Sequence, residues 1–248
     1  MTEKTLKAIT QILLLSVIAI TPFFKISSLY FPYVSGKVYL FRLLVMLAFF
    51  FWVWLMLKEK EYCPNLKNLL VVALVLFFLA QVFVSFFGVA PVYSFFSSIS
   101  RADGVWQYGF WVLYFLILIS VFKKEQDWQT FFSVFIIASF LISIFTWLGY
   151  PPQQELYGNL FGNPAYFSGF LLFGLGFSLL VFERKFFNSR FINNSPRISS
   201  SGAKGAFAFF FGKNALEVVL RGLFLAAALF FAITLIFTQI RGGYAGLA

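Results

Sequence analysis

The stretch LLVVALVLFFLAQVFVSFFG, Leu69–Gly88, decides the fold of this chain because it carries no charge over about twenty residues. A helix rises about 1.5 Å per residue, so this length crosses the hydrocarbon core of a bilayer, about 30 Å thick. Such a run is typical of a transmembrane helix. We therefore predict that Leu69–Gly88 spans a membrane.

Six further apolar stretches predict spans of the same kind: Ala8–Phe24, Val38–Leu57, Val105–Phe122, Phe131–Leu148, Pro164–Phe182 and Gly222–Ile240. An eighth stretch begins after Arg241 and has too few residues to cross. We expect an all-α fold, a polytopic transmembrane helical bundle of seven full spans plus the start of an eighth. Residues 1–248 would form a single transmembrane domain that is truncated at its C-terminus.

Composition excludes several other classes of protein. The chain is 61% hydrophobic and 11% charged, whereas soluble domains are about 25% charged. Its net charge of +10 is spread between the apolar spans, so it does not indicate a nucleic-acid partner. The single cysteine, Cys63, excludes an internal disulfide and a thiolate metal cluster, and we expect no metal and no cofactor. There is no histidine to act as a general base.

The distribution of lysine and arginine predicts the orientation. With a cytoplasmic N-terminus, fourteen of the 19 basic residues fall on the cytoplasmic side, as the positive-inside rule requires. The longest polar stretch, 183–214, then becomes a basic cytoplasmic loop, and Arg241 lies at the outer face.

Arg241 is the leading candidate for contact with a substrate. A charged side chain in a membrane helix has an unfavourable free energy of insertion, so its presence there indicates a functional role. Gly242 and Gly243 follow it and let a ligand approach the backbone closely. The guanidinium group of Arg241 would donate two hydrogen bonds to a phosphate. The alternative is an anchor that reaches the outer headgroups.

A second candidate is the outer loop Ser94–Tyr108, which holds Arg101, Asp103 and Gly104 and then Trp106. It is either a headgroup or sugar site, or an interfacial aromatic belt with an Arg101–Asp103 pair. Asp103 is also one of two candidates for a base, together with Glu155.

A third candidate is Gly162-Asn163-Pro164. Asn163 is placed to cap a helix that begins at Pro164, and a helix N-terminus attracts anions. The alternative is a cap with no further role.

In this order the motifs resemble the bacterial O-antigen ligase/polymerase family. The similarity lies in Ser97 to Gly104, in Gly162-Asn163-Pro164, and in the segment Thr238 to Gly242 that closes a span. It extends over roughly Val92–Ala248. Ile240 and Ala165 stand where the family often has serine and asparagine. The outer loop and functional histidine of the family would lie beyond Ala248, so the general base that the family supplies would be absent from this chain.

The resemblance implies a metal-independent glycosyltransferase of the bacterial inner membrane. It would move a glycan from undecaprenyl diphosphate to an acceptor hydroxyl at the periplasmic face, the acceptor being a glycan, a lipid or a protein. Substrate-binding residues would be Arg241, Arg101, Gly242 and Asn163, and membrane lipids would be further partners. We expect the truncated chain alone to be inactive.

Two other functions stay open. A transporter or flippase-like permease would line an aqueous path with its arginines, but it should carry polar residues at mid-membrane. The middles of these spans, such as Leu70–Phe78, are apolar, which disfavours transport. A non-enzymatic membrane assembly subunit is the third possibility.

Overall fold

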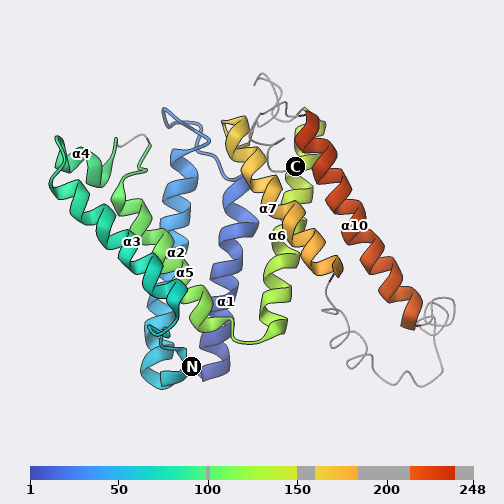
Figure 1. Cartoon of the computed structure of the whole chain (residues 1–248), viewed down its shortest axis with the longest axis horizontal. Helices are drawn as coiled ribbons and strands as arrows, with labels where there is room; N and C mark the ends of the chain where they lie inside the picture. The colour runs from blue at the N-terminus through green and yellow to red at the C-terminus, as the bar shows by residue number, and fades with distance from the viewer. Residues whose placement is uncertain (99–100, 150–159, 184–212, 238–248) are drawn as a thin grey trace. The chain divides into compact units, whose positions relative to one another are not determined.

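The computed structural model describes residues 1–98, 101–149, 160–183 and 213–237 of the chain. In these ranges the fold is all-α, with eight α-helices and two short 3-10 helices (Figure 1). The all-α part of the predicted fold class is therefore confirmed for these residues. The basic loop expected at 183–214 and the start of the eighth span fall outside the described residues almost entirely.

Among the described residues five helices are long and apolar enough to cross a membrane, so the prediction of seven full spans is wrong. The five are Glu3–Phe23 (α1, Glu3–Ile20, with η1, Thr21–Phe23), Ser35–Lys58 (α2), Leu69–Phe86 (α3), Glu125–Trp147 (α6) and Pro164–Phe182 (within α7, Pro164–Glu183). Five candidate spans indicate a multi-pass membrane protein.

The other two expected spans are shorter apolar helices. α5, Val105–Val121, has 17 residues, which is about 26 Å of helix against a hydrocarbon core of about 30 Å. It ends before Lys123 and Lys124, which a helix in hydrocarbon would not bury. In α10, Lys213–Phe237, the apolar part is Gly222–Phe237.

Helix starts are set by side chains that satisfy the free backbone N–H groups of the first turn. Asn68 accepts a hydrogen bond from the backbone N–H of Leu70 at 2.9 Å and opens α3. Thr2 does the same for α1 through the N–H of Thr5, at 3.3 Å.

The described helices form two compact units. Unit 1 comprises Met1–Lys123 together with Leu160–Gly162. In it α1 packs against α2 and α5, whereas α3 packs against α5 and against the short helix α4, Pro91–Phe96. The core of unit 1 consists of fully buried aliphatic side chains: Leu6, Leu14, Val45, Ala48, Leu55, Ile117 and Val121.

One end of unit 1 joins the N-terminus to the loop that follows α2. Lys58 Nζ donates to the backbone oxygen of Met1 at 2.7 Å, and Tyr62 Oη donates to Glu3 Oε1 at 3.0 Å. Tyr62 is 3% exposed. Burial raises the pKa of its phenol, as do the nearby carboxylates of Glu3 and Glu61. We call this the N-terminal end of unit 1.

The opposite end carries α4, together with the C-terminal ends of α1 and α3 and the first turns of α2 and α5 (Figure 1). We call it the α4 end of unit 1. Its described residues are 21–42, 86–98, 101–107 and 160–162.

Unit 2 contains α6, α7 and α10, and α7 packs against both of the others. Small residues allow this approach: a Cβ at Gly174 of α7 would lie 2.8 Å from Ser139 Oγ of α6. Trp147 Nε1 donates to Thr234 Oγ1 at 3.1 Å and joins α6 to α10.

Candidate anion-binding site

The α4 end of unit 1 contains an arginine within a membrane helix. Arg42 lies seven residues after the start of α2 at Ser35, which is about 10 Å along the helix. Its Nε donates to Gln107 Oε1 at 2.8 Å, and its Nη2 donates to the backbone oxygen of Ala102 at 2.8 Å. Arg42 therefore joins α2 to the first turn of α5 and to the loop before it.

The partners of Arg42 leave its charge uncompensated. Both are neutral oxygen atoms, and Arg42 makes no ion pair with any residue in the described ranges. Gln107 is 3% exposed. Because Arg42 Nε can only donate, the Gln107 oxygen must face it and the Gln107 NH₂ group must face elsewhere. Gln107 Nε2 and Arg42 Nη1 have no hydrogen-bond partner in the part of the chain that the structure describes. The pair thus presents donors without acceptors, which suits an anion.

Three more cations lie at the same end, and every one of the four faces an aromatic ring. The distances to the ring centroids are 5.7 Å for Lys25 and Tyr33, 4.3 Å for Lys37 and Phe161, 5.6 Å for Arg42 and Phe110, and 5.6 Å for Arg101 and Phe31. Cation–π contacts hold a cation in place without neutralising its charge. Asp103 is the one carboxylate among the described residues of this end, so positive charge predominates there.

Lys37 lies in the first turn of α2 and is half-buried. Its Nζ donates to the backbone oxygen of Leu160. This bond holds the segment Leu160–Gly162 on unit 1. Gly162 has φ +67, and an added Cβ would lie 3.1 Å from Tyr33 Cβ, so glycine is required for the close approach.

The loop between α4 and α5 is held in an unusual conformation. Ser97 and Ala102 have φ of 60° and 54°, a region that residues with a side chain adopt rarely. Ser97 Oγ donates to Asp103 Oδ1, and the N–H of Ala102 donates to Ser98 O at 2.8 Å. Such strain persists where surrounding contacts fix the backbone. Here Arg42 supplies one of these contacts through the Ala102 carbonyl.

Gly104 permits the closest backbone contact of this loop. A Cβ at this position would lie 2.5 Å from Phe95 O and 2.7 Å from Ser97 N. Because both are backbone atoms, no side-chain rotation can relieve the overlap. Gly104 thus lets the end of α4 lie directly against the start of α5.

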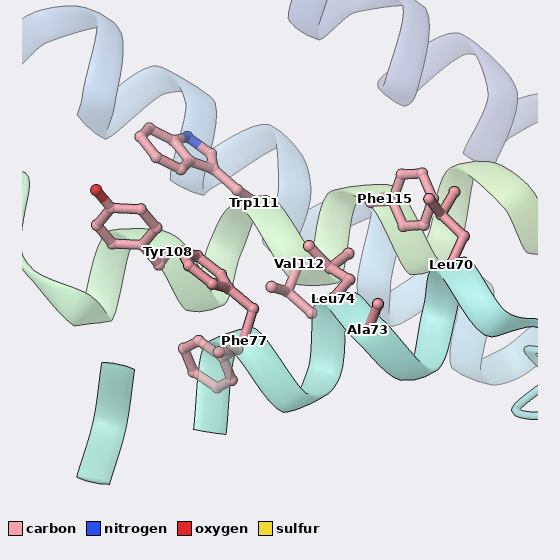
Figure 2. A pocket seen from close by; sticks show the side chains of 9 residues that line it. Leu70, Ala73, Leu74, Phe77, Tyr108, Trp111, Val112 and Phe115 are labelled. Atoms are coloured by element: carbon pink, nitrogen blue, oxygen red, sulfur yellow. The ribbon is translucent and has the colours of Figure 1, made fainter. Parts of the chain in front are cut away.

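Aromatic rings adjoin the site, and the same unit contains an apolar pocket. Trp106 is 46% exposed and its ring centroid lies 6.2 Å from that of Phe95 and 5.7 Å from that of Phe110. Between α3 and α5 lies a pocket of about 420 Å³, lined by apolar and aromatic side chains such as Phe77 and Trp111 (Figure 2). The pocket itself is apolar, whereas the four cations of the site lie at the α4 end of unit 1.

The predicted site residues have different outcomes. Arg101 is exposed and stacks on Phe31, and it makes no ion pair with Asp103, contrary to one of the two interpretations of this loop. Asn163 caps α7, since its Oδ1 accepts from the N–H of Ala165 at 2.8 Å. A role in binding for either residue stays a prediction. Arg241 and Gly242 lie outside the described residues, as does Glu155.

None of the three sequence motifs includes Arg42 or Lys37, and the partners of Arg42, Ala102 and Gln107, lie in the outer loop Ser94–Tyr108 without a predicted role. A glutamine in an otherwise apolar helix was the available signal for Gln107, because a buried amide needs a polar partner. Nothing in the sequence placed Lys37 beside Leu160, which is 123 residues away. In the described ranges no three His, Cys, Asp or Glu side chains come together as metal ligands.

No family model, curated protein or solved structure matches this chain. The resemblance to the O-antigen ligase/polymerase family therefore stays a prediction that rests on short motifs.

Proposed function

We propose that the α4 end of unit 1 binds the diphosphate headgroup of a lipid-linked glycan, and that the protein transfers this glycan to an acceptor hydroxyl. The observation that carries the proposal is the Arg42–Gln107 pair, which offers hydrogen-bond donors and an uncompensated positive charge within a membrane protein. Lys25, Lys37 and Arg101 add positive charge at the same end.

A diphosphate on a lipid fits this end better than a soluble anion does. Arg42 lies about 10 Å into a membrane helix, so its ligand must reach the boundary between headgroups and hydrocarbon. Lipid phosphates lie at that depth, and an isoprenoid chain would keep the headgroup there. The rings that face the four cations hold these charges in place without neutralising them.

The proposed reaction is a substitution at the anomeric carbon of the donor. The acceptor oxygen forms a bond to this carbon, and the bond from the carbon to the phosphate oxygen breaks. The hydroxyl proton passes to a base, and the diphosphate leaves on its carrier lipid with both electrons of the broken bond. Arginine and lysine would stabilise the negative charge that develops on the diphosphate.

The proposed roles extend the predictions from sequence. Arg101 would contact the diphosphate or the glycan, and Arg241 with Gly242, which lie outside the described residues, stay proposed phosphate contacts. Asn163 and the N-terminus of α7 remain candidates for an anion contact. Asp103 is the one carboxylate among the described residues of this end, but we do not assign it the role of general base. We place the protein in a bacterial inner membrane with a cytoplasmic N-terminus, which puts the α4 end at the periplasmic face.

Arg101→Ala should weaken binding of a polyprenyl diphosphate about fivefold to tenfold, the loss of one charge-assisted contact at an exposed position. The fold should persist because the side chain is exposed. Titration of the protein in nanodiscs measures the affinity. Lys67→Ala is the matched control, since Lys67 is exposed at the N-terminal end of unit 1. Equal losses in both variants would show non-specific charge attraction and refute the site.

A further inference from the structure

The segment that ends α3 and forms α4 exposes a continuous series of large apolar side chains. Their exposed fractions are 65% for Phe86, 76% for Phe87, 75% for Val92, 62% for Tyr93 and 55% for Phe96. α4 has no fully buried residue. An exposed apolar surface of this kind at a helix end requires a partner, because water would disfavour it.

The length of α3 sets the depth of this segment. α3 has 18 residues, about 27 Å of helix, which nearly equals the thickness of the hydrocarbon core. A chain that leaves α3 at Phe86 is therefore at the boundary between hydrocarbon and headgroups. Pro91 then opens α4 within a few residues, before the chain can extend into water.

The apolar surface of α3 continues directly onto this segment. Only Val71 and Ser85 of α3 are buried, and its exposed side chains include Leu76, Leu79 and Phe83. A membrane helix with such a surface faces lipid. The aromatic residues that follow it are the types enriched at membrane interfaces.

We propose that residues 86–96 form an interfacial element that lies in the lipid headgroup–acyl boundary at the α4 end of unit 1. Its occupant is the bilayer itself, because its surface is continuous with the lipid-facing surface of α3. The inference does not depend on glycan transfer and would hold for any polytopic function.

This placement also fixes the depth of the neighbouring loop. The end of α4 lies against Gly104, where a Cβ would meet Phe95 O at 2.5 Å. The Phe96 and Trp106 ring centroids lie 6.3 Å apart. An α4 segment held in the membrane surface would therefore keep Arg101 and Asp103 at headgroup level.

Single-cysteine labelling tests this inference. The native Cys63 is replaced by serine, and cysteine is introduced by Val92→Cys or Tyr93→Cys, with Asn65→Cys as the exposed control at the N-terminal end. Each variant is labelled with bimane and placed in nanodiscs that hold one chain. Quenching is measured with a lipid carrying a nitroxide near the headgroup and with iodide in the buffer.

We expect lipid quenching about threefold or more stronger at positions 92 and 93 than at position 65, with iodide quenching in the reverse order. Strong iodide quenching at 92 and 93 would place the segment in water and overturn the inference. Protection from both quenchers would indicate another part of the protein as the partner and would overturn it equally. A blue shift of the bimane emission that appears only in larger discs holding two chains would assign the surface to a second copy of the chain. That result would also overturn the inference.

Discussion

Arg42→Met is expected to weaken polyprenyl diphosphate binding about tenfold to a hundredfold, because it removes a charge-assisted donor at a half-buried position. Methionine keeps the length and apolar contacts of the side chain, so the change removes mainly the charge and its hydrogen bonds. Arg42→Lys should lose less affinity, since it keeps the charge but not the two-pronged donor.

The same variant should also be destabilised. Gln107 is 3% exposed and would lose the partner of its oxygen, a cost of about 1–3 kcal/mol. Thermal melting in detergent measures this loss. The double variant Arg42→Met/Gln107→Leu removes both polar groups, so its melting temperature should recover while its affinity stays low.

That pair of measurements separates a binding role from a structural one. If affinity recovers together with stability in the double variant, Arg42 only supports the fold and the proposed diphosphate site is wrong. If Arg42→Met changes neither the affinity nor the melting temperature, the hydrogen bonds to Gln107 and Ala102 contribute to neither binding nor stability.

Gly104→Ala is expected to displace the loop between α4 and α5. The new methyl group would overlap backbone atoms at 2.5 Å from Phe95 O and 2.7 Å from Ser97 N, so the backbone itself must move. The cost should be about 1–3 kcal/mol, as for other overpacked positions. Hydrogen exchange in peptides covering 95–107 should become faster, and binding of polyprenyl diphosphate should weaken with it.

Gly176→Ala is the matched control for this substitution. Gly176 is exposed on α7, and no atom lies within 4 Å of the position of its added Cβ. Alanine also favours a helix over glycine, by about 1 kcal/mol. This variant should keep or raise stability and leave exchange at 95–107 unchanged. Unchanged exchange in Gly104→Ala as well would show that α4 does not lie against α5 as described.

The membrane fold could be predicted because each helix is specified locally. The uncharged run at Leu69 predicted α3 to within two residues, and Pro164 after Asn163 predicted the start and cap of α7. The prediction of seven full spans was wrong for a physical reason. Hydropathy placed Val105–Phe122 and Gly222–Ile240 among the spans, but in the described residues their apolar helices are shorter, Val105–Val121 and Gly222–Phe237.

The candidate site could not be predicted from the sequence, because its contacts join residues far apart in the chain. Arg42 meets Gln107 across 65 residues, and Lys37 meets Leu160 across 123. Neither pair follows from helix periodicity. The short local motif Arg101–Gly104 was recognised, but the ring of Phe31 beneath Arg101 comes from a different loop.

Photo-crosslinking tests most directly whether the α4 end of unit 1 holds the lipid diphosphate. A polyprenyl diphosphate carrying a diazirine next to the phosphates is bound to the protein in nanodiscs, irradiated, and mapped by mass spectrometry. We predict labelled peptides from 25–42 and 95–107, with labelling reduced by unlabelled diphosphate and in Arg42→Met. Labelling confined to the N-terminal end, at 58–67, or labelling that unlabelled diphosphate does not reduce, would contradict the proposed site.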